Sequence, residues 1–188
     1  MAATLTKITG EFRQVMSTAK TKENGQYNTV VLTNGTLYSC GYRTTVIMPM
    51  DNTKVFSIGK EANVTMAGTN QQACISGNQA KVTISGLNDR VFIDGAETRV
   101  VSTGYGTRIG NAGCDTEIVL HEGCAIIESE KPCAVHLYGP SCKFKLPFGS
   151  YITVDDSTHM VGDWFLLPNT WYGVRDGKIK RMKEEIIR

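Results

Sequence analysis

The stretch KVTISGLNDRVFIDGAETRVVSTG, residues 81–104, decides the fold because glycine closes a unit in it every nine residues. The same spacing continues on both sides of this stretch. The glycines on the grid are Gly41, Gly59, Gly68, Gly77, Gly86, Gly95, Gly104 and Gly113. A fixed period over this length indicates a repeat architecture in which each unit is one structural element.

Two columns of each unit, the fifth and the seventh, are apolar or small. The fifth holds Val55, Val64, Ala73, Val82, Val91, Val100 and Ile109, and the seventh holds Met66, Ile75, Ile84 and Ile93 before Ser102 and Asn111. A spacing of two places both columns on one face of a β-strand. β-Branched residues suit a strand, and we expect the repeat glycine to adopt the positive φ of a sharp corner.

A single strand of this kind cannot bury its apolar face alone, so successive units must stack. Two units per coil give a flattened solenoid in which alternate units lie on opposite faces. The sequence therefore predicts an all-β, two-sided β-solenoid (β-helix) of nine-residue half-coils. The unit GCAIIESE, residues 123–130, is one residue short, and we expect a turn to absorb this slip.

The N-terminal segment does not follow the nine-residue grid. GEFRQVMSTAK, residues 10–20, predicts a short helix, and Asn34-Gly35 between apolar alternations predicts a β-hairpin. We therefore expect residues 1–50 to form an N-terminal cap with a hairpin, followed by the repeat solenoid over residues 51–149.

The C-terminal segment, residues 150–188, is expected to form a second cap that ends in a basic tail. Asp176-Gly177 predicts a hairpin turn there. Four aromatic residues are expected to close the last coil, with a contact surface for a partner as the alternative: Trp164, Phe165, Trp171 and Tyr172. Solenoids need such caps because their terminal coils expose strand edges.

Composition excludes several classes of protein. The net charge of +2 excludes a strongly acidic DNA mimic and does not favour nucleic acid as a partner. There is no apolar run long enough to span a bilayer, so no membrane segment is expected. MAATLTKITGEFRQ, residues 1–14, lacks an apolar stretch, so we expect no signal peptide and a cytoplasmic location in the host cell.

The six cysteines do not have the spacing of a metal site. They are Cys40, Cys74, Cys114, Cys124, Cys133 and Cys142. Zinc sites usually contain closely spaced ligand pairs, and no such pair is present. We therefore predict no metal and no cofactor, and expect reduced, packed thiols in which Cys124 and Cys142 stack and Cys133 lies opposite.

Catalytic patterns are weak. His121, His136 and His159 are scattered, and no nucleophile elbow, zinc-protease or phosphate-loop motif is present. The residues two positions after the repeat glycines do not supply the regular aspartates of a calcium-binding nonapeptide solenoid. We predict that the chain is not an enzyme, and a carbohydrate-active solenoid is the weakest alternative.

The fourth column offers candidate binding residues in Arg90, Arg99 and Arg108. Alternation places Arg90 and Arg108 on one face and Arg99 on the other. Stacked arginines can meet phosphates or a partner's carboxylates. Ordinary solvated side chains that discourage association between strand edges explain them equally well. Trp164, Trp171 and Tyr172 form the second candidate surface.

RVVSTGYGTRIGNAGCDTEI, residues 99–118, and FLLPNTWYGVRDGKI, residues 165–179, resemble uncharacterised phage, prophage and bacterial proteins with short ice-nucleation-like repeats. The resemblance covers about residues 59–180, and the N-terminal part up to residue 55 departs from it. It implies a β-solenoid of mobile-element origin and carries no established activity.

These observations favour a protein-binding module over a catalyst. A rigid solenoid presents a ladder of side chains that loses little entropy on binding. We expect a host protein or complex as the partner, and inhibition of a host defence complex is the specific hypothesis. The alternative is a structural, self-assembling component of a virion or filament, which leaves homo-oligomerisation open.

Overall fold

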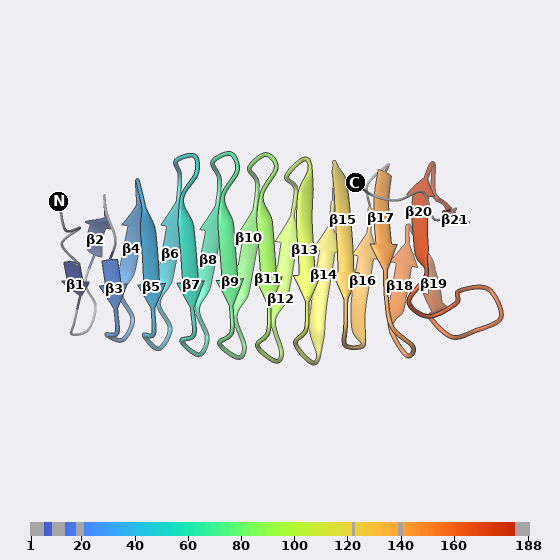
Figure 1. Ribbon diagram of the computed structural model, residues 1–188, viewed down its shortest axis with the longest axis horizontal. Helices are drawn as coiled ribbons and strands as arrows, with labels where there is room; N and C mark the ends of the chain where they lie inside the picture. The colour runs from blue at the N-terminus through green and yellow to red at the C-terminus, as the bar shows by residue number, and fades with distance from the viewer. Residues whose placement is uncertain (1–5, 9–13, 18–20, 122, 139–140, 183–188) are drawn as a thin grey trace.

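The computed structural model describes residues 6–8, 14–17, 21–121, 123–138 and 141–182, and forms a two-sided β-solenoid (Figure 1). The described residues contain no helix. The first sheet contains, in spatial order, β1 (Thr6–Ile8), β3 (Thr21–Glu23), β5 (Thr36–Ser39), β7 (Lys54–Ser57), β9 (Gln72–Ile75), β11 (Arg90–Ile93), β13 (Thr107–Asn111), β15 (Cys124–Ser129), β17 (Ser141–Lys145), β20 (Trp171–Arg175) and β21 (Lys178–Arg181).

The second sheet forms the opposite face of the solenoid. It contains, in spatial order, β19 (Ser157–Met160), β18 (Tyr151–Val154), β16 (Cys133–Leu137), β14 (Thr116–Leu120), β12 (Arg99–Ser102), β10 (Lys81–Ile84), β8 (Asn63–Met66), β6 (Thr45–Met48), β4 (Thr29–Leu32) and β2 (Gln14–Ser17). Successive strands thus alternate between the sheets through most of the chain, which confirms the two-sided solenoid.

Strand register confirms the coil length of the central repeat. Lys54 pairs with Gln72, and Gln72 pairs with Arg90, so each coil contains two full nine-residue units. The coils near the N-terminus are shorter, because Thr29 pairs with Thr45, whereas two full units would align it with Ile47. Strands β3 to β6 nevertheless join the same two sheets, so the coils begin before residue 51.

The two N-terminal predictions of local structure are wrong. Asn34 and Gly35 connect β4 to β5, which lie in different sheets, so they form a solenoid corner and not a hairpin. Gly35 supplies a φ of 80°, which a corner uses as readily as a hairpin does. Residues 14–17 of the predicted helix form strand β2, and its other residues lie outside the described ones.

The predicted slip lies at one corner of the second half of the rod. Thr107 pairs with Ala125, a full coil later, whereas Thr116 pairs with Cys133, one position short of a full coil. The missing residue is therefore in the corner over residues 130–132. The strands on either side keep their inward columns, so the core continues across the slip.

The core confirms the two predicted inward columns. Val91 and Ile93 in β11 are buried, and their equivalents in the other coils form one continuous cluster. A third inward column, three positions into each unit, was not predicted. It precedes the strand by one residue and includes Thr53, Gln71, Asp89 and Thr98, all buried.

The expectation that the repeat glycines adopt a positive φ is wrong, since none of them has one. Positive φ falls two residues later, at 57° for Asn70 and 57° for Asn88. The glycines instead allow the coils to stack closely. A Cβ on Gly77 would lie 2.7 Å from the carbonyl carbon of Gly59 and would overlap its oxygen. Glycine is required here by backbone contact between coils.

Antiparallel strands close the C-terminal end of the rod. β20 pairs with β17, and β18 pairs with β19. The hairpin predicted at Asp176-Gly177 joins β20 to β21, with φ values of 52° and 68° at these two residues. Tyr172 is buried and stacks on Phe144, with ring centroids 5.6 Å apart. Tyr172 therefore closes the last coil, as predicted, whereas the prediction is wrong for Trp164 and Phe165, which are exposed.

Candidate binding surfaces

The three candidate arginines lie on two faces of the solenoid, as the alternation predicts. Arg90 in β11 pairs in register with Arg108 in β13, so their side chains project side by side from the first sheet. Arg99 lies in β12 of the second sheet, where its Nε is 3.0 Å from Glu117 Oε2. Arg99 thus already has a carboxylate partner within the protein.

Arg90 and Arg108 belong to a longer row along the rod axis, which we call the cationic row. Its members, in register from β7 to β17, are Lys54, Gln72, Arg90, Arg108, Ile126 and Lys143. The ion pairs between described residues involve other side chains. The four cations of this row are therefore available for an external anion.

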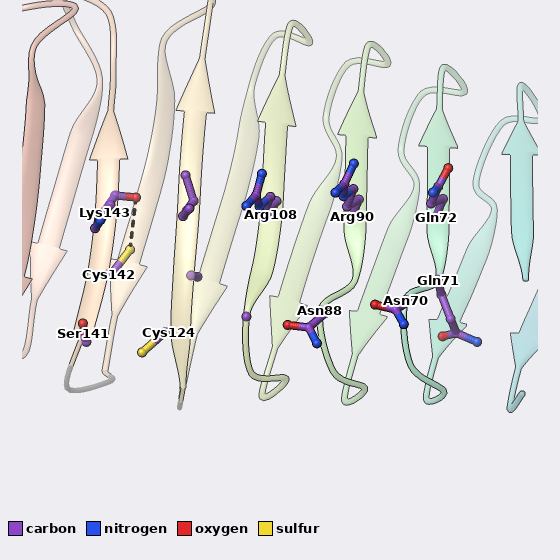
Figure 2. A pocket seen from close by; sticks show the side chains of 13 residues that line it. Asn70, Gln71, Gln72, Asn88, Arg90, Arg108, Cys124, Ser141, Cys142 and Lys143 are labelled. Atoms are coloured by element: carbon purple, nitrogen blue, oxygen red, sulfur yellow. Dashed lines mark hydrogen bonds between the residues drawn. The ribbon is translucent and has the colours of Figure 1, made fainter. Parts of the chain in front are cut away.

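A groove of about 600 Å³ runs beside the cationic row, where the corners enter the first sheet (Figure 2). Arg90, Arg108 and Lys143 line one side of it. Asn70, Asn88 and Ser141 add polar groups nearer the corners. No acidic residue is among the described residues that line the groove. Its volume is in the range of small-molecule sites, and its charge suits an anion.

A second row lies two positions further along the same strands, and we call it the aromatic row. Its members in register are Tyr38, Phe56, Cys74, Phe92 and Gly110. The rings of Tyr38 and Phe56 stack with centroids 5.2 Å apart. Phe56 and Phe92 remain 41% and 47% exposed. An opening of about 250 Å³ over Cys74 is lined by both phenylalanines and by Lys54 and Arg90.

A buried carboxyl group lies next to the groove. Asp89 Oδ1 accepts a hydrogen bond of 2.8 Å from the backbone N–H of Gln71, and Gln71 lines the groove. Asp89 Oδ2 and Gln71 Oε1 are both buried without a hydrogen-bond partner among the described residues. Burial raises the pKa of Asp89 to about 6, because it disfavours the charged form. Neither residue was singled out in the sequence.

Three of the four candidate aromatic residues of the C-terminal cap line one hollow, and Trp171 is not among its lining residues. The segment over residues 161–170, which we call the cap loop, extends from the rod between β19 and β20 (Figure 1). Trp164 in this loop is 95% exposed, and Phe165 and Leu167 beside it are also exposed. These three residues line a hollow of about 270 Å³ together with Tyr172, Ile179 and Arg181.

Trp171 and Tyr172 follow the cap loop in β20 and point to opposite faces of the strand. Trp171 pairs with Lys145, whose ammonium group lies 6.0 Å from the ring centroid. The Tyr172 side chain is 5% exposed, and its hydroxyl accepts a hydrogen bond of 2.8 Å from the Leu167 N–H. Tyr172 therefore supports the cap loop from below and offers little surface to a partner.

The cysteines separate by burial. Cys133 and Cys142 are buried, and desolvation raises the pKa of Cys142 to about 12. Cys40 and Cys114 are exposed. Cys124 pairs with Ser141 and not with Cys142, because the slip shifts the predicted alignment by one residue. The described residues contain no group of three or more histidine, cysteine or acidic side chains that converges on a point.

None of the described elements is a helix that is long and apolar enough to cross a membrane.

Comparison of the chain with family models, curated proteins and solved structures gives no match. The candidate surfaces are therefore defined by geometry and charge alone. They are the cationic and aromatic rows with their groove on the first sheet, and the exposed tip of the cap loop.

Proposed function

We propose that this chain is a non-enzymatic protein-binding module of phage or mobile-element origin. In this proposal it occupies a site on a host protein, such as a component of a defence complex. The mobile-element context rests on the resemblance of residues 59–180. The protein-binding role rests on the cap loop, and on one observation above all, the 95% exposure of Trp164.

An exposed tryptophan beside other exposed apolar side chains leaves surface in water that a partner can cover. Phe165 and Leu167, which follow Trp164 in the cap loop, are such side chains. Burial of such surface stabilises a complex by about 25 cal/mol per Å². Tryptophan is also enriched among the residues that dominate the free energy of protein–protein binding. The tip of the cap loop thus has the chemistry of an anchor for an apolar pocket.

The base of the cap loop is fixed to the rod, which lowers the entropy cost of binding. Leu166 is fully buried, and its carbonyl accepts a hydrogen bond of 2.7 Å from the Gly162 N–H. Tyr172 holds the other side through the Leu167 N–H. A loop anchored in this way presents Trp164 in a restricted set of positions before the partner arrives.

The experiment is an affinity capture from host lysate with the tagged protein, followed by mass spectrometry and a sizing column. We expect a stoichiometric host protein that is captured by the wild type and lost with Trp164→Ser. The matched control is Tyr151→Ser, which removes an exposed aromatic side chain from the second sheet. Capture that survives Trp164→Ser would contradict the role of the cap loop.

The same experiment addresses self-assembly. Recovery of the protein only with itself, as a defined multimer, would favour a structural role in a virion or filament. The edge strand β21 disfavours the addition of further copies at the C-terminal end of the rod. It carries Lys178, Lys180 and Arg181, and positive charges on an edge strand oppose the addition of a like strand.

A further inference from the structure

Charge is distributed unequally between the two sheets. The outward side chains described on strands β3 to β17 of the first sheet include six cations: Lys22, Lys54, Arg90, Arg108, Lys143 and Lys145. Glu128 is the one acidic residue among them, and its Oε1 is 2.9 Å from Lys145 Nζ. On the second sheet the outward cations Lys81 and Arg99 are accompanied by Glu117. The small net charge of the chain therefore hides one strongly positive face.

The cationic row has the dimensions of a track for a linear polyanion. Lys54 and Lys143 lie five strand spacings apart, which at about 4.8 Å per spacing is about 24 Å. Arg90 and Arg108 occupy neighbouring strands within this length. A single phosphate would instead require cations that converge on one point. Cations spread along one axis fit several phosphates in succession.

The aromatic row runs parallel to the cationic row, two residues further along each strand. Two strand residues span about 6.6 Å, so a chain whose phosphates follow the cations would bring its bases over the rings. The opening over Cys74 gives access to the ring faces, because cysteine is small and both Phe56 and Phe92 border it. The Phe92 ring lies near Gly110, where an added Cβ would be 3.2 Å from Cδ2. The ring thus leans away from Phe56.

We propose that this face of the first sheet binds single-stranded nucleic acid, with phosphates along the cationic row and bases stacked on Phe56 and Phe92. A positive track combined with exposed aromatic rings is the recurrent design of such sites. A duplex fits less well, because its bases are stacked within the helix and cannot reach the rings. The amides of Asn70 and Asn88 in the groove supply hydrogen bonds to sugars or base edges. This inference is independent of the cap loop.

The test is fluorescence anisotropy with a labelled single strand of about 12 mixed nucleotides, as DNA and as RNA, over a range of salt concentrations. With four cations engaged, log K against log salt should have a slope of about −3. Arg90→Gln and Arg108→Gln should each reduce the slope by about 0.7. The matched control, Arg99→Gln on the second sheet, should leave both affinity and slope unchanged.

The aromatic row is tested separately from the charge. Phe92→Ala should weaken binding by about 5- to 150-fold without a change in the salt slope. Because the Phe92 side chain is exposed, Phe92→Ala should leave the thermal unfolding midpoint nearly unchanged. Arg90→Lys should retain most of the binding if the residue acts as a charge on a phosphate.

Four results would overturn the proposal. The first is no binding of either single strand at low salt, and the second is tighter binding of a duplex than of the single strands. The third is a loss of affinity with Arg99→Gln as large as that with Arg90→Gln. The fourth is competition by polyglutamate, which has no bases, equal to that by a single strand, together with no effect of Phe92→Ala. The last result would assign the face to an acidic protein instead. Trp164→Ser should not alter nucleic-acid binding, so failure here and failure of protein capture remain distinguishable.

Discussion

Asp89 Oδ1 accepts a hydrogen bond of 2.8 Å from the backbone N–H of Gln71, one coil earlier in the same inward column. This bond ties two successive coils together at the corner beside the groove. The other carboxyl oxygen, Oδ2, is buried and has no partner among the described residues. A charged carboxylate at this place is therefore poorly solvated, and this raises the pKa of Asp89 above its ordinary value.

The raised pKa of Asp89 predicts that stability falls as the pH rises. The pKa is about 6 in the folded protein and 3.8 as the ordinary value, so the folded state binds the proton more tightly. This group stabilises the fold fully below pH 4, and the contribution is lost between about pH 4 and pH 6. A shift of this size corresponds to at most about 3 kcal/mol, and solvent in the adjacent groove screens part of it. Asp89→Asn should therefore stabilise the protein by about 1 to 2 kcal/mol at pH 8 and have little effect at pH 4.

Denaturant unfolding at both pH values measures this difference. Asp94→Asn is the matched control, since Asp94 is exposed at a corner, and it should change stability little at either pH. Equal effects of Asp89→Asn at pH 4 and pH 8 would contradict the assigned role of burial.

The stacking of the repeat glycines predicts a large cost for adding one methyl group. Gly77→Ala should destabilise the protein by about 3 kcal/mol or more, because the Cβ overlaps the Gly59 carbonyl in the neighbouring coil. Gly110→Ala is the matched control, since its Cβ would meet only the Phe92 side chain, which is exposed. We expect Gly110→Ala to cost less than about 1 kcal/mol. Similar unfolding midpoints for the two variants would show that glycine is not required for stacking.

Two aromatic residues of the cap should differ in their effect on stability. Tyr172→Ala removes a buried ring stacked on Phe144 and the acceptor for the Leu167 N–H, and should cost about 3 to 5 kcal/mol. Trp164→Ala removes a fully exposed ring and should change stability by less than about 0.5 kcal/mol. Thermal unfolding of both variants makes the comparison. A large loss with Trp164→Ala would mean that this side chain packs within the protein.

Thiol labelling should separate the cysteines into groups. Cys40 and Cys114 are exposed and should react within the dead time of a colorimetric thiol assay in native buffer. Cys133 and Cys142 are buried, and their raised pKa leaves little thiolate at pH 8, so they should react only after unfolding. Mass spectrometry of the labelled peptides identifies each site. Rapid native labelling of Cys142 would contradict the packing between β17 and the cap.

The sequence was sufficient for the fold because the inward columns have a period of two. Val91 and Ile93 mark one strand face, and the repeat carries this pattern from coil to coil. The third inward column was missed because Gln71 and Asp89 are polar and resemble loop residues. Extending the period of two by one step toward the N-terminus would have found it.

Local signals misled where more than one structure uses the same residues. The corner between β4 and β5 contains only residues 33–35, whereas the corner between β6 and β7 contains residues 49–53. The shorter corner shortens the coil and removes it from the nine-residue grid. Asn34-Gly35 between apolar alternations predicts a hairpin, but a solenoid corner uses the same residues, because both structures accept a positive φ at glycine.

The candidate site was only partly predictable. Alternation placed Arg90 and Arg108 together on one face, and the structure has them there. Phe56 and Phe92 were not singled out, because an apolar residue in a strand is expected to be buried. Their sixth position between two inward columns was the signal that they point outward. Net charge carried no information about the positive face, since it sums over both sheets.

Quantitative capture from host lysate with three tagged proteins tests directly whether this chain binds a host protein through its cap loop. They are the wild type, Trp164→Ser and the Tyr151→Ser control. We expect one stoichiometric host protein with the wild type and the control, and its loss with Trp164→Ser at an unchanged unfolding midpoint. Equal capture by all three proteins, or no partner with any of them, would contradict this expectation.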